Sequence, residues 1–407
     1  MPLNPVTRRA TSLGAYLITL HVLLAYGLPG GALFLLAVAA GVLYWRIGVY
    51  GAVSVSFSVV VATLVYSLAL RVTGFDASIY YRPDEMLSRF HADKQHRAYQ
   101  PNSIIRMRMP YGDLQPLTAE HIAVPRDVEY RIDGYGFRND ADFNNERYVL
   151  VGDSFIAGSS NTQADLLSNH LKRDYALAAY NLAHPGEMPD YLSYVSAFSG
   201  SHEGLRVLLF VFEGNDFEPS KDTSESAGHR LWRRYYEMFS GTNVYRVTKS
   251  LTKRAMRRSQ IAGSAYVTIG NLRGHKMAFL TRYVEATRAR EQLPIQEFER
   301  VLVRLQSRLE HVYFIPTSYR IYHRHLAEGS GPLPDAKWQY LDTLCQRERI
   351  ACTNLTGPMQ RAADELLARD QFMWWPDDTH WNGNGVAVAA RVVAESLGRG
   401  DHRPRRP

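Results

Sequence analysis

Three long apolar stretches open the chain, at Leu13–Leu28, Ala32–Trp45 and Ala52–Leu70. A helix needs roughly 20 apolar residues to cross ~30 Å of hydrocarbon, so the third stretch is long enough and the first two must borrow flanking residues. Between the first and last of these residues the only formal charge is Arg46. We therefore expect a membrane anchor at residues 1–75 with about three transmembrane helices, or with two if one short stretch is re-entrant.

Basic residues in short loops set the orientation of such an anchor. Arg8 and Arg9 precede the first stretch and would remain in the cytoplasm. With three spans, Arg46 also lies on the cytoplasmic side and everything after Leu70 emerges outside, although Arg71 then lies on the outer side. With two spans, the large domain would stay in the cytoplasm. We expect a multi-pass protein of the inner (plasma) membrane whose large domain lies outside the cytoplasm, which is the periplasm if the cell is Gram-negative.

The next segment, residues 76–146, is mixed in character and contains no long periodic run. Near its end, Glu129-Tyr130-Arg131-Ile132 reads as a strand, and Asp133-Gly134 is a turn signal. We interpret this segment as a lead-in region with short strands.

Apolar strands and amphipathic helices alternate from residue 147 onward. The expected strands are Tyr148–Val151, Leu177–Leu182, Leu205–Phe212, His311–Ile315 and Ile350–Leu355. The expected helices are Ala164–Arg173, Asp190–Phe198, Ile295–Leu309, Ala336–Arg347, Pro358–Arg369 and Gly385–Leu397. This alternation predicts an α/β fold, a three-layer sandwich in which helices cover both faces of a mainly parallel sheet.

Residues 217–293 interrupt the alternation and divide the α/β domain into 147–216 and 294–398. This insertion is rich in Arg, Tyr and Ser, and we expect it to be helical, for example at His229–Phe239. Its aromatic and basic side chains could stack on sugar rings or lie at a lipid interface. A helical cap whose aromatic residues form its own core is the favoured interpretation. Residues 399–407 read as a disordered basic tail.

Composition adds little beyond this division. Hydrophobic residues make up 46% of the chain and charged residues 21%, so the composition is not that of a disordered protein. The formal net charge is +7. A basic protein tethered to a membrane meets anionic lipid or acidic glycan more readily than nucleic acid, and we expect no nucleic-acid partner.

No metal or cofactor site is indicated. Phosphate-loop and dinucleotide fingerprints are absent. His323 and His325 lack a carboxylate or cysteine at ligand spacing, and we expect both at the surface. The two cysteines, Cys345 and Cys352, fit neither a metal knuckle nor a redox motif, and their spacing leaves open whether they pair.

The residues that suggest chemistry begin at Val151-Gly152-Asp153-Ser154-Phe155, where a serine follows the end of the first predicted strand. Ligands of open parallel sheets bind beyond the carboxyl ends of the strands. Backbone N–H groups at the start of the next segment could stabilise an oxyanion there. The alternative is an ordinary turn in which Asp153 and Ser154 cap a helix.

Two further segments also follow predicted strands. His184-Pro185-Gly186 could bring a glycine N–H to the same edge, and Gly214-Asn215-Asp216 could offer a side-chain amide, although each alone reads as a turn. Near the carboxyl terminus, Asp377-Asp378-Thr379-His380-Trp381 combines a histidine with carboxylates two and three residues before it. A serine hydroxyl needs such a base, oriented by an acid, to become a nucleophile.

These residues, in this order, resemble the SGNH (GDSL-like) hydrolase family. The lead-in Tyr130-Arg131-Ile132-Asp133-Gly134-Tyr135-Gly136-Phe137-Arg138 also looks like that of bacterial members. The resemblance covers roughly residues 129–215 and 295–398. It implies Ser154 as nucleophile and His380 as base, with an oxyanion hole formed by the Ser154 N–H, the Gly186 N–H and the Asn215 side chain.

The resemblance leaves the acid ambiguous. The broad family carries its aspartate three residues before the histidine, which corresponds to Asp377. Its relatives that acetylate exopolysaccharides, similar to alginate O-acetyltransferases, carry Asp-x-His-Trp, which corresponds to Asp378-Thr379-His380-Trp381. We favour Asp378.

Three functions follow as hypotheses. The first is a membrane-anchored serine esterase that removes an acyl group, most simply acetyl, from a cell-envelope glycan or lipid. The second is an O-acyltransferase that passes an acetyl group through Ser154 to an exopolysaccharide hydroxyl, for which a separate membrane protein would have to supply acyl groups. The third is a non-catalytic envelope scaffold that binds polysaccharide. A scaffold has no physical need for a base beside a hydroxyl, which disfavours the third.

Overall fold

The computed structural model describes residues 88–91, 96–200, 202, 204–218, 266–327, 329 and 331–398. The expected membrane anchor, the helix expected at His229–Phe239 and the basic tail lie outside these residues. Within the described part of the chain, no helix combines the length and apolarity that crossing a bilayer requires.

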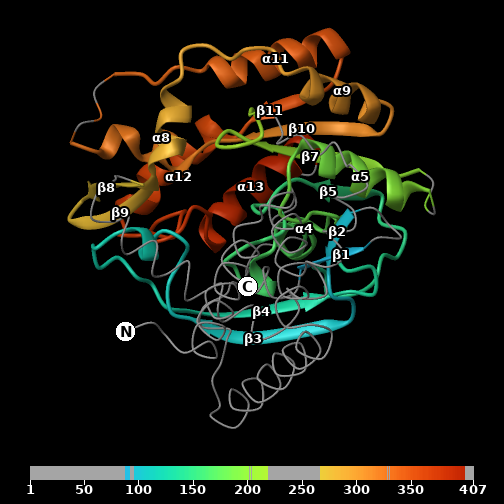
Figure 1. The fold of residues 1–407 in the computed structure, drawn as a ribbon, viewed down its shortest axis with the longest axis horizontal. Helices are drawn as coiled ribbons and strands as arrows, with labels where there is room; N and C mark the ends of the chain where they lie inside the picture. The colour runs from blue at the N-terminus through green and yellow to red at the C-terminus, as the bar shows by residue number, and fades with distance from the viewer. Residues whose placement is uncertain are drawn as a thin grey trace, which may run out of the picture. The chain divides into compact units, whose positions relative to one another are not determined.

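Five parallel strands form the central sheet, in the order β6-β5-β7-β10-β11 (Figure 1). Their bounds are β5 Tyr148–Val151, β6 Ala179–Asn181, β7 Arg206–Phe212, β10 Leu309–Ile315 and β11 Cys352–Asn354. From β5 the chain steps to β6 on one side, then returns to the other side for β7, β10 and β11. The loops after β5 and β7 therefore flank the point where the order reverses, which is where sheets of this kind bind ligands.

Strands β5, β7 and β10 are mainly apolar because both faces of the sheet are buried along most of their length. One face carries Leu150, Leu208, Phe210, Tyr313 and Ile315, which belong to one hydrophobic core. Alternate residues, such as Val149, Val207, Leu209, Val312 and Phe314, belong to a second core on the opposite face.

Helices cover each face of the sheet (Figure 1). The first core receives residues of α4 Leu167–Tyr175, α10 Ser318–Tyr322, α12 Thr356–Leu367 and α13 Gly383–Ser396. The second receives residues of α5 Met188–Ser199, α9 Gln296–Leu305 and α11 Ala336–Glu348. The predicted α/β fold with a parallel sheet flanked by helices is thus confirmed. The five-residue helix α10 was not among the helices expected from the sequence.

The lead-in region forms two antiparallel pairs. They are β1 Ser88–His91 with β2 His96–Tyr99, and β3 Ser103–Met109 with β4 Arg126–Ile132. Strand β4 extends the strand expected at Glu129–Ile132. Its alternate residues Val128, Tyr130 and Ile132 form a small core with Tyr99 and Met109. Short 3-10 helices lie at Gln115–Leu117, Gln163–Asp165 and His323–His325.

The described end of the insertion begins with a hairpin that the sequence did not predict. Strands β8 Val267–Leu272 and β9 His275–Leu280 pair across Arg273 and Gly274, both of which have positive φ, and α8 Thr281–Arg288 follows directly. The N–H of Ala278 donates to the carbonyl of Pro376 at 2.9 Å. Because Pro376 directly precedes the Asp377-Asp378-Thr379-His380 segment, the hairpin lies against the loop that carries the histidine.

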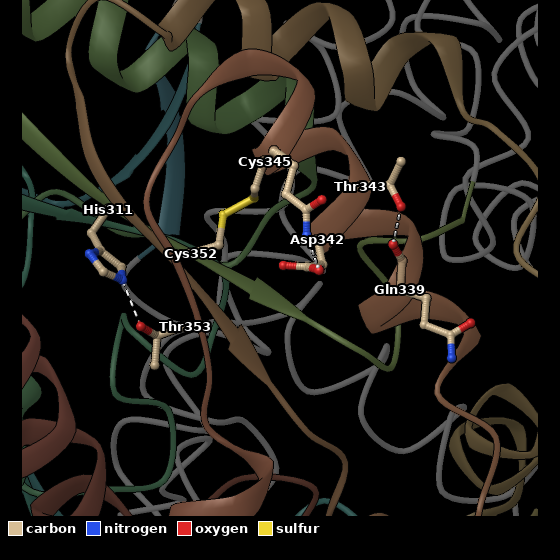
Figure 2. The surroundings of a disulfide bond; sticks show 8 residues. His311, Gln339, Asp342, Thr343, Cys345, Cys352 and Thr353 are labelled. Atoms are coloured by element: carbon tan, nitrogen blue, oxygen red, sulfur yellow. Dashed lines mark hydrogen bonds between the residues drawn. A yellow bond between two sulfur atoms is a disulfide. The ribbon is translucent and has the colours of Figure 1, made fainter.

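A disulfide joins Cys345 near the end of α11 to Cys352 at the start of β11, with the two Cα atoms 6.2 Å apart (Figure 2). Arg349 adopts a left-handed conformation between them, and the N–H of Ile350 donates to the carbonyl of Cys345 at 2.8 Å. This tight turn brings the two cysteines within bonding reach. The pairing that the sequence left open is therefore present.

Candidate active site

Ser154 lies in the tight turn that leaves strand β5. A Cβ atom on Gly152 would lie 2.8 Å from Cγ1 of Ile156, so glycine lets the chain turn at this point. The Asp153 carboxylate accepts a hydrogen bond from the N–H of Phe155 at 2.9 Å, and the Ser154 carbonyl accepts one from the N–H of Ser159, also at 2.9 Å. These bonds hold the serine at the sheet edge, half-buried.

His380 meets this serine although 226 positions separate them. Its Nε2 lies 2.8 Å from Oγ of Ser154, within hydrogen-bonding distance. The Phe155 ring lies 5.2 Å from the imidazole and 5.1 Å from the Trp381 ring, centroid to centroid. Packing around Phe155 thus fixes the carboxyl-terminal loop against the turn that carries Ser154.

The two neighbouring aspartates have different partners. Oδ1 of Asp378 lies 2.6 Å from Nδ1 of His380 and also accepts the backbone N–H of His380 at 3.0 Å. Asp377 points elsewhere and accepts the N–H groups of Gly112 at 2.7 Å and Val124 at 2.9 Å. The structure therefore brings Ser154, His380 and Asp378 into one chain of hydrogen bonds and leaves Asp377 outside it.

A buried guanidinium bridges both aspartates. Arg126, at the start of β4, donates through Nη1 to Asp377 at 2.9 Å and through Nη2 to Asp378 at 2.8 Å. Its side chain is 4% exposed and both carboxylates are fully buried. Arg126 was not identified from the sequence. The signal was present in the Asp377-Asp378 pair, because two adjacent carboxylates in a buried loop require a cation.

Other lead-in residues also hold the loop. The Asp113 carboxylate accepts the N–H of Thr379 at 2.8 Å and its hydroxyl at 2.7 Å. A Cβ atom on Gly112 would lie 2.4 Å from the carbonyl oxygen of Asp377, so only glycine fits there without displacement. No local pattern in the sequence marks these two residues, since their partners lie more than 260 positions away.

The expected oxyanion donors follow the strands on either side of β5. Gly186 follows β6, where an added Cβ atom would lie 2.8 Å from Oδ2 of Asp190 in the first turn of α5, and Asn215 follows β7. Within the described residues, no hydrogen bond engages the N–H of Ser154, the N–H of Gly186 or the side chain of Asn215, whose Oδ1 is buried. The three segments follow neighbouring parallel strands and therefore leave the sheet at the same edge.

Two buried interactions fix the loop that carries Asn215. Arg320 donates to the Glu213 carboxylate through Nε at 2.9 Å, and the N–H of Thr317 donates to it at 3.0 Å. On the other side of Asn215, the Asp216 carboxylate accepts the Tyr191 hydroxyl at 2.9 Å and the N–H of Phe212 at 2.8 Å. Neither Arg320 nor Tyr191 was identified from the sequence.

Burial shapes the acid–base character of this region. Burial raises the pKa of Asp153 to about 6. The hydrogen bond that its carboxylate accepts from the Phe155 N–H, and the nearby His380, lower this pKa and so partly oppose the effect of burial. Burial also raises the pKa of Asp216 well above its usual value, and the neighbouring Asp153 adds to that shift. The site can therefore hold protonated carboxyl groups beside the serine turn under mildly acidic conditions.

The end of the insertion contributes Tyr283 of α8 to the surroundings. A Cβ atom on Gly214 would lie 2.9 Å from Cδ1 of Tyr283, and the Tyr283 and Phe212 ring centroids are 5.2 Å apart. The hydroxyl accepts a hydrogen bond from Arg282 at 3.1 Å. Burial raises the pKa of Tyr283 to about 12, against the effect of Arg282, so the phenol stays neutral beside the Asn215 loop.

Metal-ligand spacing occurs in one group of the described residues, formed by Asp113, Asp378 and His380. These atoms already bond to Thr379, to Arg126 and to one another, and the Arg126 guanidinium supplies the positive charge. The group therefore fits a hydrogen-bonded charge network.

The surface position expected for His323 is wrong, because it is buried with its ring 5.2 Å from that of Tyr319. His325 does have a carboxylate partner, Asp364, at 3.0 Å.

Comparison with known proteins does not identify a family for this chain. No family model matches it, and no curated protein is significantly similar to it in sequence.

Proposed function

We propose that this protein is a serine hydrolase that cleaves an ester, with Ser154 as nucleophile, His380 as general base and Asp378 as the acid that orients the histidine. The observation that carries the proposal is the continuous hydrogen-bonded chain from Ser154 Oγ through His380 to Asp378, with distances of 2.8 and 2.6 Å. A chain of this type lets an imidazole accept the serine proton while the carboxylate holds its tautomer and stabilises the imidazolium.

In the proposed reaction, Oγ of Ser154 attacks the ester carbonyl carbon as its proton passes to Nε2 of His380. The oxyanion that forms accepts hydrogen bonds from the Ser154 N–H, the Gly186 N–H and the Asn215 side-chain amide. One such donor typically contributes about 3 kcal/mol of transition-state stabilisation. The imidazolium then protonates the leaving alkoxide, and water or another hydroxyl releases the acyl group by the reverse sequence.

We further infer that the domain is an SGNH-type sandwich preceded by the membrane anchor. Support comes from the parallel sheet, from Ser154 directly after its first strand and from the Gly186 and Asn215 segments after the next two strands. The substrate would be an ester, most simply acetyl, of a cell-envelope glycan or lipid at the membrane surface.

Acyl transfer to an exopolysaccharide hydroxyl is the second candidate, and one observation favours it. Asp378 rather than Asp377 contacts His380, and Trp381 packs against Phe155. This arrangement uses the Asp-x-His-Trp spacing of the polysaccharide-acetylating relatives that the sequence resembles. Hydrolysis and transfer share every step up to the acyl-enzyme and differ in the hydroxyl that attacks it. A transferase would need a membrane partner to supply acyl groups.

The disulfide supports placing the domain outside the cytoplasm. Cys345 and Cys352 are bonded, and disulfides persist in oxidising compartments such as the periplasm. Three membrane spans would deliver the domain there. Intact cells test this location, since a membrane-impermeant thiol reagent should label these cysteines only after reduction. Labelling that requires lysis would place the domain inside.

The activity is tested with the purified full-length chain, an acetyl ester and an organophosphorus probe. Wild-type protein should release acetate and form a probe adduct at Ser154, and Ser154→Ala and His380→Ala should abolish both. His325→Ala is the matched control, because His325 pairs with Asp364 and not with the Ser154–His380–Asp378 hydrogen bonds. This variant should retain acetate release and the probe adduct.

Asp378→Asn and Asp377→Asn form a second matched pair, adjacent and equally buried. We expect Asp378→Asn to lower kcat by about 10³–10⁴-fold through loss of the correct histidine tautomer, and Asp377→Asn to have a much smaller effect. Added oligosaccharides that become acetylated would favour transfer over hydrolysis. A Ser154→Ala protein that hydrolyses the ester at the wild-type rate would refute the proposed function.

A further inference from the structure

Ser160 has a backbone conformation that its residue type does not favour. It lies six residues beyond Ser154 in the loop after β5, with φ at 66° in the left-handed region. Residues with a Cβ atom occupy this region at a cost in free energy that glycine does not bear. The residue is 1% exposed, so solvation of its hydroxyl does not offset that cost. An interaction of the buried side chain is the natural compensation.

The hydroxyl has such an interaction. Oγ of Ser160 donates to Oδ2 of Asp378 at 2.7 Å, across 218 positions of sequence. The backbone N–H of Ser160 donates to the hydroxyl of Tyr130 at 3.1 Å, which fixes the residue from the β4 side. The left-handed turn thus places the hydroxyl against the carboxylate that is hydrogen-bonded to Nδ1 of His380.

The carboxylate of Asp378 divides its hydrogen bonds between its two oxygens. Oδ1 faces His380 and accepts from Nδ1 and from the backbone N–H. Oδ2 accepts from Ser160, from Nη2 of Arg126 at 2.8 Å and from the N–H of Asp113 at 3.1 Å. Donors on Oδ2 prevent the carboxylate from rotating about its Cβ–Cγ bond, so Oδ1 stays directed at the imidazole.

We propose that Ser160 is a positioning residue whose hydroxyl fixes the plane of the Asp378 carboxylate and lowers its basicity. The proposal rests on the function proposed above, because it assigns Ser160 a role through the acid of that reaction. A hydrogen bond to an ionised carboxylate stabilises the charged form and disperses its charge. Loss of the hydroxyl would therefore concentrate charge on the Asp378 carboxylate and strengthen its attraction for protonated His380, and it would remove one of the three donors that hold Oδ2 in place.

Several other charged groups face His380 and remain in place when the hydroxyl is removed. Asp153 lies in the loop after β5, Asp113 lies in the lead-in region, and Arg126 reaches the site from β4 through Asp378. A change in the histidine's titration in a Ser160 variant would therefore report on Asp378 and its hydroxyl donor.

Two variants of the full-length chain test the proposal. Ser160→Ala and Ser160→Gly both remove the hydroxyl, but only glycine also relieves the left-handed backbone. We expect kcat on the acetyl ester and the rate of organophosphorus labelling at Ser154 to fall about tenfold or more in both variants, as expected for one hydrogen bond to a charged group. KM should stay within about twofold, and the acid limb of the kcat/KM profile should move to higher pH in both.

Stability separates this role from a purely structural one. The glycine variant should unfold at a higher temperature than the alanine variant, while the two share the same loss of kcat. Ala176→Gly is the matched control, since Ala176 also has positive φ (53°) but is exposed at the end of α4, and its activity should match that of wild type.

Two results would overturn the proposal: wild-type kcat and pH profile in both Ser160 variants, or activity restored by glycine but lost with alanine. The second result would make Ser160 a backbone support only. Ser154→Ala is run in parallel. Full activity in that variant refutes the hydrolase function itself, whereas its inactivity beside fully active Ser160 variants refutes only the role of Ser160.

Discussion

Replacing Arg126 by methionine would remove the cation between Asp377 and Asp378 while keeping much of the side chain's volume. The guanidinium donates to the two carboxylates at 2.9 and 2.8 Å, and none of the three side chains is more than 4% exposed. In the variant, two carboxylates would remain where water does not reach them. Removing one partner of a buried ion pair costs about 3–5 kcal/mol, because the remaining charge is uncompensated.

Other donors should limit that loss. Asp377 keeps the N–H groups of Gly112 and Val124, and Asp378 keeps the Ser160 hydroxyl and the His380 contacts. We therefore expect Arg126→Met to lower the free energy of unfolding by about 3 kcal/mol, at the low end of that range.

The measurement is urea unfolding followed by tryptophan fluorescence, with Arg106→Met as the matched control. Arg106 pairs with Glu129 across β3 and β4, but its side chain is 68% exposed, and such a surface pair contributes at most about 1 kcal/mol. Adding Asp377→Asn to Arg126→Met should recover part of the loss, because one buried charge is then neutral. The reasoning is refuted if Arg126→Met costs no more than Arg106→Met.

Three further outcomes are expected. Burial raises the pKa of Asp153 from 3.8 to about 6, so its contribution to stability is full below about pH 4 and is lost as the pH rises through about 6. Asp153→Asn should therefore stabilise the protein by about 3 kcal/mol at pH 8 and by little at pH 4. Thermal unfolding at the two pH values measures this, and an equal stabilisation at both would contradict it. Gly112→Ala should lower the free energy of unfolding by about 1–3 kcal/mol and remove much of the esterase activity, because the new Cβ would lie 2.4 Å from the Asp377 carbonyl oxygen. An unchanged melting temperature and an unchanged rate would show that the loop moves aside without cost. Cys345→Ser should lower the free energy of unfolding by about 2–3 kcal/mol and leave kcat unchanged, since the disulfide closes a short loop at the edge strand β11. Unfolding of the wild-type protein with and without reductant measures the same contribution.

The regular elements of the α/β domain could largely be predicted because their signal is local. Apart from Arg206, the run Arg206–Phe212 is apolar on both faces, as expected of a strand in a covered parallel sheet, and the structure has it as β7. The hairpin β8–β9 was missed because Val267–Leu272 contains Gly270 and Asn271, which weaken the strand pattern. Helix α10 has five residues, too few for a helical period to be recognised.

The candidate site divides in the same way. Ser154 and Asn215 were found because each directly follows a recognisable strand, and His380 because carboxylates stand beside it in sequence. Arg126 and Ser160 were missed because their partners in the carboxyl-terminal loop lie 252 and 218 positions away. Their sequence neighbours carry no pattern that distinguishes them from ordinary lead-in and turn residues.

By itself, the amino-acid order indicated where most strands and helices of the α/β domain form, since side-chain periodicity and turn residues act over a few positions. It also placed a hydroxyl, an amide and an imidazole at element ends. Only the tertiary structure decided that Asp378 rather than Asp377 turns to His380. Both carboxylates are chemically alike and adjacent, and Arg126 bonds to both, so the choice depends on the other donors around them. The N–H groups of Gly112 and Val124 hold Asp377, whereas Ser160 and His380 hold Asp378. Those donors converge only when the chain is folded.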